Sequence, residues 1–151
     1  MQRVAACERH HAALRVHAGR IGQDARVVDV EVVPVMDAAV RIGRAPALAL
    51  ADLADRPVFC TLGEKGILVT EPKASTGKIV PGFPVTGPID SVGAGDSTSA
   101  GIACALACGM SVEEAAAFGN LIASITIQQL GTTGSATPEQ VRERWKEVGK
   151  D

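Results

Sequence analysis

The stretch that most constrains this chain is "DSVGAGDSTSAG", residues 90–101. A Gly-Ala-Gly turn is followed at once by the carboxylate of Asp96 and then by small, mostly apolar residues as far as Gly109. Alanine favours helix, and glycine lets the backbone take turns that other residues resist. The stretch therefore predicts a helix that begins near Asp96 and continues to Cys108, with Gly109 as its stop signal.

The N-terminal end of such a helix is suited to hold an anion. The amides of Gly93, Ala94 and Gly95 would lie there without intrahelical acceptors, and the helix dipole favours a negative charge at this end. Phosphate is the anion that most often occupies such a turn. Asp96 would stand beside it, where a carboxylate can accept the proton of an attacking hydroxyl. The arrangement indicates phosphoryl transfer to an alcohol, although spacing alone leaves open that Asp96 only caps the helix.

Two other glycine-rich phosphate motifs do not fit the chain. A dinucleotide fingerprint that started at Gly93 would need a glycine at the position of Thr98. The sequence G-x-x-x-x-G-K-[ST], which marks a P-loop, occurs nowhere in the chain. The phosphate hypothesis therefore rests on the helix start at residues 93–96.

Composition narrows the class of protein. The 151 residues are 46% hydrophobic and 21% charged, which is typical of one globular domain with a real core. The 15 basic and 17 acidic residues give a net charge of -2, unlike the basic surface of a nucleic-acid binder. The longest apolar run is shorter than the roughly 20 residues that span a bilayer, and the N-terminus lacks a signal-peptide core. We expect a cytoplasmic protein without nucleic-acid or membrane partners.

The cysteines and histidines do not form a recognised ligand pattern. The chain has four irregularly spaced cysteines, Cys7, Cys60, Cys104 and Cys108. Cys104 and Cys108 would share a helix face, so a metal or redox pair is conceivable, but small buried apolar side chains are the commoner role. Cys7 also lies close to three histidines, His10, His11 and His17. That spacing matches no closed zinc site, and we interpret the group as a solvated helix face.

The basic residues change type along the chain, which predicts a boundary. All of them are arginine as far as Arg56, apart from the histidines, and every lysine lies at Lys65 or beyond. We therefore divide the chain into residues 1–56, a diverged or unrelated lead-in, and residues 57–151, the main region.

The lead-in gives mixed local signals. Residues 3–19 predict a helix, and the valine-rich residues 25–35 predict a strand that Pro34 interrupts. Residues 36–56 are helical in composition, but Gly43 and Pro46 interrupt them.

Signals in the main region agree with one another. Residues 57–62 and 66–70 predict short strands, and extended pieces follow within 78–85. Ser111 with Glu114 forms a capping box for a helix over about 112–129, and Thr137 with Gln140 starts a last helix through Trp145. Strands followed by helices indicate α/β or α+β layering.

Residues 90–103, "DSVGAGDSTSAGIA", resemble the second signature of the PfkB (ribokinase-like) carbohydrate kinases, usually D-T-x-G-A-G-D-x-F. The flanking "TLGEKGILV", "NLIASITIQQLGTTGS" and "TPEQV" also occur in the order of that family. The resemblance covers about Pro57 to Val148, the C-terminal part of such kinases. It implies an α/β fold with a ribokinase-like layered sheet and flanking helices, C-terminal part only.

The resemblance implies ATP-dependent phosphoryl transfer to a hydroxyl of a sugar or nucleoside, with Mg²⁺ screening the phosphates. The implied catalytic base is Asp96, and the implied anion hole is formed by Gly93, Ala94 and Gly95. The implied ATP-binding residues are Thr61, Gly63, Gly66 and Asn120. In members that use a monovalent cation such as K⁺, the ligands would match Asp90, Val92, Thr126, Gln129, Gly131 and Ser135.

Three departures from the family bear on activity. Thr98 stands where the family usually has phenylalanine, and no N-x-x-E motif, which the family uses in handling magnesium, occurs upstream. The N-terminal half, which carries the family's sugar-binding residues and small β lid, has no counterpart here. We therefore expect a homodimer or the missing N-terminal half as a partner, besides ATP and a small-molecule sugar. The alternatives are a truncated nucleotide-binding remnant without catalysis and a purely structural domain.

Overall fold

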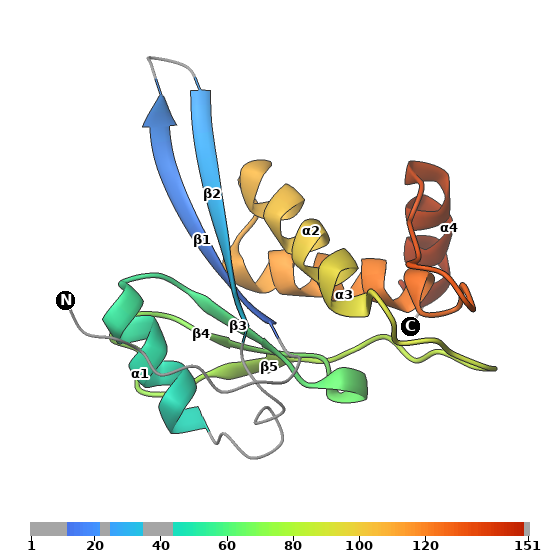
Figure 1. The fold of residues 1–151 in the computed structure, drawn as a ribbon, viewed down its shortest axis with the longest axis horizontal. Helices are drawn as coiled ribbons and strands as arrows, with labels where there is room; N and C mark the ends of the chain where they lie inside the picture. The colour runs from blue at the N-terminus through green and yellow to red at the C-terminus, as the bar shows by residue number, and fades with distance from the viewer. Residues whose placement is uncertain (1–11, 22–24, 35–43, 150–151) are drawn as a thin grey trace.

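The computed structural model describes residues 12–21, 25–34 and 44–149, which form a five-stranded sheet with helices on both faces (Figure 1). Neighbouring strands are antiparallel throughout, in the order β2-β1-β3-β4-β5. The elements are β1 (Ala12–Ile21), β2 (Ala25–Pro34), α1 (Arg44–Ala54), β3 (Val58–Thr61), the 3-10 turn η1 (Gly63–Lys65), β4 (Ile67–Thr70), β5 (Lys78–Val80), α2 (Ala94–Ala107), α3 (Val112–Thr126) and α4 (Pro138–Val148).

The first two strands form a long hairpin that projects from the rest of the sheet (Figure 1). The helix predicted over residues 3–19 is wrong where the structure describes it, because Ala12–Ile21 is a strand. It pairs with β2 along its whole length, from Ala12 opposite Pro34 to Ile21 opposite Ala25. Strand pairing with the valine-rich partner overrides the weak helix preference of this segment. The strand predicted in the valine-rich segment is confirmed.

The sheet packs its two faces against different helices. Successive side chains of a strand point to opposite faces. The Thr70 hydroxyl donates to the Ala47 carbonyl oxygen at 3.1 Å, which ties one face of β4 to α1. Ile67 and Val69 point to the other face and join the apolar core with α2 and α3. That core consists of Phe59, Ile67, Val69, Ile102, Ala105, Ala115 and Ala116.

Helices α2 and α3 approach each other closely at a glycine. A Cβ atom at Gly119 would lie 2.7 Å from Cγ1 of Ile102 and 3.1 Å from the carbonyl oxygen of Thr98. A side chain at this position would therefore force the two helices apart. The contact holds the first turns of α2 against the middle of α3, which matters for the site below.

The ends of the helices follow the sequence signals closely. The backbone N–H of Glu114 donates to the Ser111 hydroxyl, and the N–H of Ser111 donates to the Glu114 carboxylate at 2.8 Å. Thr137 and Gln140 form the same reciprocal pair at the start of α4. Helix α2 ends before Gly109, whose φ is 84°. Among the helices of residues 44–149, none has the length and apolar character that a membrane crossing requires.

Candidate functional site

The start of α2 has an open backbone turn. Gly93 lies just before the helix with φ 78°, a left-handed conformation that glycine adopts most readily. The helix therefore begins at Ala94, and Asp96 is its third residue. The N–H of Ala94 donates to the Ser91 carbonyl at 3.2 Å. The amides of Gly93 and Gly95 have no acceptor among the residues that the structure describes. These two donors are available to a ligand.

Asp96 lies exposed beside these amides. Within residues 44–149 its carboxylate forms no hydrogen bond or ion pair with another side chain or amide. A Cβ atom at the neighbouring Gly95 would meet nothing within 4 Å, so the space in front of the turn is open. The structure therefore places a free carboxylate next to free backbone donors.

The loop between α3 and α4 packs against this helix start. The Ser97 hydroxyl donates to the carbonyl oxygen of Gly134 at 3.3 Å. A Cβ atom at Gly93 would lie 2.6 Å from Cγ2 of Thr133, so only glycine allows this close approach. The loop thus supports one side of the turn and leaves the side of Gly95 open.

Asp90 connects the segment before α2 to the same loop. Its N–H donates to the Ile127 carbonyl at 2.7 Å, and its carboxylate accepts from the amides of Val92 at 3.0 Å and Gly131 at 2.9 Å. These two backbone hydrogen bonds, first that of Val92, lower the pKa of the Asp90 carboxyl below its usual value. Asp90 therefore carries a negative charge and fixes the loop geometry.

The six residues that resemble monovalent-cation ligands lie around one loop. Asp90 holds Val92 and Gly131 as described above. The Gln129 side chain donates to the Ser135 carbonyl at 2.6 Å and accepts from its amide at 3.1 Å. The N–H of Gln129 donates to the carbonyl oxygen of Thr126 at 3.1 Å. Carboxylate and carbonyl oxygens are the donors that a hard cation prefers, but the oxygens of Asp90, Thr126 and Ser135 described here already accept hydrogen bonds from the protein.

The turn over residues 61–66 folds tightly on itself. The N–H of Leu62 donates to the Gly66 carbonyl at 2.7 Å, and the N–H of Gly66 donates to the Gly63 carbonyl at 3.0 Å. Gly66 has φ 95°, and a Cβ atom there would lie 2.1 Å from the Val80 carbonyl oxygen. Gly63 faces open space, since a Cβ atom there would meet nothing within 4 Å. The turn therefore packs on the end of β5 at Gly66 and is free at Gly63.

Asn120 is buried, with 7% of its surface exposed, and already has partners within the protein. Its Nδ2 donates to the carbonyl oxygens of Val80 at 3.1 Å and Pro81 at 3.0 Å. This ties α3 to the end of β5, on which the turn of Gly66 also packs. Asn120 therefore has a structural role, and only its Oδ1 atom remains for a nucleotide.

The predicted phosphate and nucleotide regions adjoin one another through α3. Gly119 contacts Thr98 in the first turns of α2, and the next residue, Asn120, holds the end of β5. Thr98 is buried, and its hydroxyl donates to the Ala94 carbonyl at 2.7 Å. Threonine thus fits this contact without leaving its hydroxyl unpaired.

Arg144 on α4 is a supporting residue that the sequence did not indicate. Its guanidinium donates to the Ser124 hydroxyl at 3.1 Å and to the Pro84 carbonyl, and it pairs with Glu147 at 3.0 Å. It thereby fixes the connection between β5 and the turn before α2. Ser124 and Pro84 are 20 and 60 residues away in sequence, so no local pattern could have identified these two contacts.

The cysteines of α2 differ from their predicted role. Cys104 and Cys108 are exposed, so their interpretation as small buried apolar residues is wrong. The helix turns Ile102 and Ala105 toward the core and the two thiols away from it. Cys60 is partly buried, and burial raises the pKa of its thiol. The cluster of Cys7, His10, His11 and His17 lies outside the described side chains.

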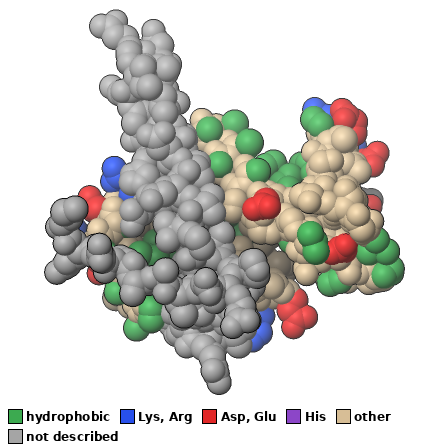
Figure 2. Space-filling model, viewed as in Figure 1, with side chains coloured by type: hydrophobic (Ala, Val, Ile, Leu, Met, Phe, Trp, Pro, Cys, Tyr) green, Lys and Arg blue, Asp and Glu red, His purple; other side chains and the backbone are tan. Residues whose placement is uncertain are grey.

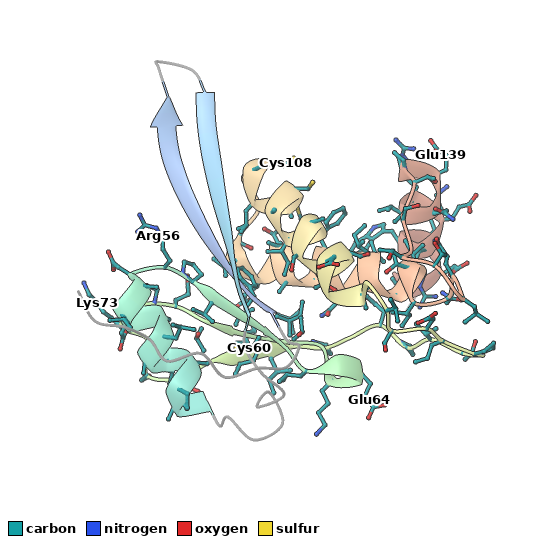
Figure 3. The ribbon with its side chains drawn as sticks, in the orientation of Figure 1. Arg56, Cys60, Glu64, Lys73, Cys108 and Glu139 are labelled. Carbon is teal, nitrogen blue, oxygen red and sulfur yellow. The ribbon has the colours of Figure 1, made fainter. Side chains whose placement is uncertain are left out.

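Figure 3 shows how far Cys108 lies from the turn of residues 61–66. Cys108 lies at the C-terminal end of α2, away from Glu64 in the 61–66 turn. The space-filling view shows acidic and basic side chains scattered over the described part of the visible face (Figure 2). Among the described residues, no group of three or more His, Cys, Asp or Glu side chains forms a metal site.

Known proteins resemble this chain over part of their length. Ribokinase of Bacillus subtilis (strain 168) is 38% identical over 77 residues, which are 51% of this chain and 25% of that protein. The adenosine kinase from Sinorhizobium meliloti is 27% identical with a TM-score of 0.58, over 68% of this chain and 30% of that one. Ribokinase from Thermotoga maritima is 27% identical with a TM-score of 0.55, over 68% of this chain and 40% of that one.

The chain therefore spans less than half the length of these relatives. The two solved structures confirm the expected α/β fold, a ribokinase-like layered sheet with flanking helices, C-terminal part only. The likeness holds over the part of each structure that the chain covers. Residues 43–140, more than half of the chain, match the family described as pfkB family carbohydrate kinase. The match includes the open turn, Asp96 and the loop that supports them, and the chain belongs to the pfkB family of carbohydrate kinases.

Proposed function

We propose that this region performs ATP-dependent phosphoryl transfer to a hydroxyl of a sugar or nucleoside, with Asp96 as the general base. The observation that carries the proposal is the free carboxylate of Asp96 beside two backbone amides without acceptors. A carboxylate beside backbone donors that can hold a phosphate has the position required of a general base for an attacking hydroxyl. The printed names of the relatives, ribokinase and adenosine kinase, support the substrate class.

In this proposal the backbone of the turn binds the transferring phosphate. The amides of Gly93 and Gly95 donate to its oxygens and the dipole of α2 stabilises its charge, whereas the amide of Ala94 stays bonded to the Ser91 carbonyl. Asp96 accepts the proton of the substrate hydroxyl as its oxygen attacks phosphorus. Magnesium on the nucleotide would screen the phosphate charge during transfer.

The rest of the nucleotide would lie along the turn of residues 61–66. The open space at Gly63 and at Gly95 is what an approaching ligand requires, and it supports ATP binding. Thr61 and Gly66 would shape the turn. Asn120 would hold the end of β5, on which the turn packs, and its Oδ1 atom would accept a hydrogen bond from the nucleotide. A K⁺ ion at Asp90 and its loop would add positive charge beside the anion turn.

The second candidate is a nucleotide-binding remnant without catalysis. It is favoured by Thr98, which stands close to Asp96 where the family usually has phenylalanine. The change of basic residues near Arg56 supports a division there into a lead-in, residues 1–56, and a kinase region, residues 57–151. On this view, the substrate-binding part must come from elsewhere.

Exposed apolar side chains around Asp90 favour the presence of a protein partner. Ile89, Val92 and Leu130 are each more than half exposed, and the hydrogen bonds of Asp90 bring their segments together. Such side chains are suited to an interface. We propose that a second copy of the chain or the missing N-terminal half covers these side chains. We also propose that the protein works in the cytoplasm, where ATP is supplied.

Titration with ATP followed by calorimetry separates these functions. Both the kinase and the remnant predict saturable binding by the purified chain, which Gly95→Ala weakens because a methyl group enters the open space. Absence of binding would leave only a structural domain. Phosphate transfer to ribose or adenosine by a full-length kinase carrying residues 57–151 then distinguishes the enzyme, which turns over, from the remnant, which does not.

A further inference from the structure

Two cysteines lie one helical turn apart at the C-terminal end of α2, outside the candidate site. Cys104 and Cys108 are both exposed. The N–H of Cys108 donates to the Cys104 carbonyl oxygen at 3.0 Å, so one helical turn separates the two residues. Residues four apart on a helix share a face, with Cβ atoms about 5–6 Å apart. Both sulfur atoms can therefore reach one bound ion.

The chain brings a third sulfur residue back to the same helix end. After Cys108 the backbone turns at Gly109, whose φ is 84°. The N–H of Met110 then donates to the Ala105 carbonyl at 3.1 Å, which places Met110 beside the last turn of α2. Its side chain is 38% exposed. Three sulfur-bearing residues thus lie at one end of one helix.

Few groups compete with these sulfurs on their own helix. The positions one turn before Cys104 and just before Cys108 are Ala100 and Ala107, and the only charged residue within α2 is Asp96. Asp96 lies about 12 Å along the helix from Cys104, given a rise of about 1.5 Å per residue. Figure 3 shows Cys108 at the C-terminal end of α2, whereas Asp96 is the third residue from the other end.

We propose that Cys104 and Cys108 bind a soft, thiophilic metal ion, with Met110 as an additional ligand. Thiolate and thioether sulfur select soft ions such as Cu(I). A structural zinc site needs a closed tetrahedral set of nitrogen, oxygen or thiolate ligands. Met110 offers a thioether, which is not among these ligands, so the three sulfur residues suit a soft ion better than zinc. Binding replaces the two thiol protons, which pass to solvent, and involves no change of oxidation state.

Competition for Cu(I) tests the proposal with the full, reduced chain. Bicinchoninate, a coloured Cu(I) chelator, is titrated against the protein under anaerobic conditions. The wild-type chain should withdraw one equivalent of Cu(I). Replacing one ligand of a chelating pair removes the intramolecular second contact, so Cys104→Ser and Cys108→Ser should each weaken binding about 10²–10⁴-fold. Met110→Leu should weaken it less, because thioether is the weaker ligand.

Cys60 provides a matched control. Cys60→Ser should leave the tight equivalent unchanged, since Cys60 is partly buried on β3. Circular dichroism and ATP affinity of every variant report whether the fold and the candidate kinase site persist, so failure here is distinct from failure of the proposed kinase function. No withdrawal of Cu(I) by wild type would overturn the proposal. So would retention of the tight equivalent in a Cys104→Ser, Cys108→Ser double variant.

Discussion

The two sides of the candidate site differ in how their polar groups are satisfied. At the start of α2, the carboxylate of Asp96 and the amides of Gly93 and Gly95 have no partner among the described residues. On the side of β5, the amide of Asn120 donates to two carbonyls and Gly66 packs against Val80. The first side therefore keeps the unpaired donors and carboxylate that the proposed phosphate site requires, whereas the polar groups of the second side are already used within the fold.

The largest effect on stability should come from Gly66→Ala. A methyl group there would meet the Val80 carbonyl oxygen at 2.1 Å, on a backbone with φ 95°. Backbone strain and displacement of β5 should together lower the free energy of unfolding by about 2–5 kcal/mol. Urea denaturation measures this loss. The matched change on the open side, Gly95→Ala, should alter stability by less than about 1 kcal/mol. Equal losses in both variants would remove the contrast between the two sides.

Asn120→Ala should have the next largest effect. It removes both hydrogen bonds to Val80 and Pro81 and leaves their carbonyls without these donors, which should cost about 1–3 kcal/mol of unfolding free energy. Gln128→Ala is the control, since its bond to the Ser124 carbonyl lies on an exposed side chain and should contribute little. If Asn120→Ala kept full stability but lost ATP affinity, Asn120 would belong to the ligand side instead.

Asp90 should make stability depend on pH. Its pKa is lowered in the folded chain, so its contribution is complete above the unfolded value of about 3.9 and is lost as pH falls through the lower folded value. The pKa of Glu114 is also lowered, by the Ser111 hydroxyl and then its amide, which adds a second loss at low pH. Asp90→Asn should reduce the fall in unfolding free energy with decreasing pH, measured by urea denaturation at several acidic pH values. Glu114→Gln should reduce another part of the same fall. An unchanged fall in Asp90→Asn would show that its loop contacts are unimportant.

Ser97→Ala should have the smallest effect. Its hydroxyl makes one hydrogen bond of 3.3 Å, to the Gly134 carbonyl, between the helix start and the supporting loop. We expect a change of about 0.5–1.5 kcal/mol or less in unfolding free energy. ATP affinity measured on the same samples should fall only slightly. A large loss of ATP affinity at unchanged stability would show that the loop between α3 and α4 takes part in ligand binding rather than only supporting the turn.

Local signals in the sequence predicted much of the fold. The capping boxes at Ser111 and Thr137 placed the starts of α3 and α4, because such bonds join residues only three apart. The start of α2 came earlier than predicted, at Ala94, since Gly93 takes the left-handed conformation and ends the preceding turn. Neighbouring residues decide these features, so sequence alone reveals them.

Contacts between segments distant in the chain could not be predicted from the sequence. The pairing with β2 that makes Ala12–Ile21 a strand, and the exposure of Cys104, depend on how elements pack rather than on local preference. The partners of Asn120 are 40 and 39 residues away, and the Pro84 carbonyl that Arg144 contacts is 60 residues away. In the candidate site, the glycine turn and Asp96 followed from a local motif, whereas the residues that support them did not.

Turnover by an Asp96→Asn variant tests the central claim most directly. In a full-length kinase carrying this region, the change keeps the size of the side chain but removes the proton acceptor. If the open side performs the chemistry, kcat should fall by roughly 10²–10⁴-fold, while melting temperature and ATP affinity stay near wild type. Asp55→Asn is the control, because Asp55 is exposed in the turn after α1 and its φ of 52° suits asparagine. An unchanged kcat in Asp96→Asn would contradict the account.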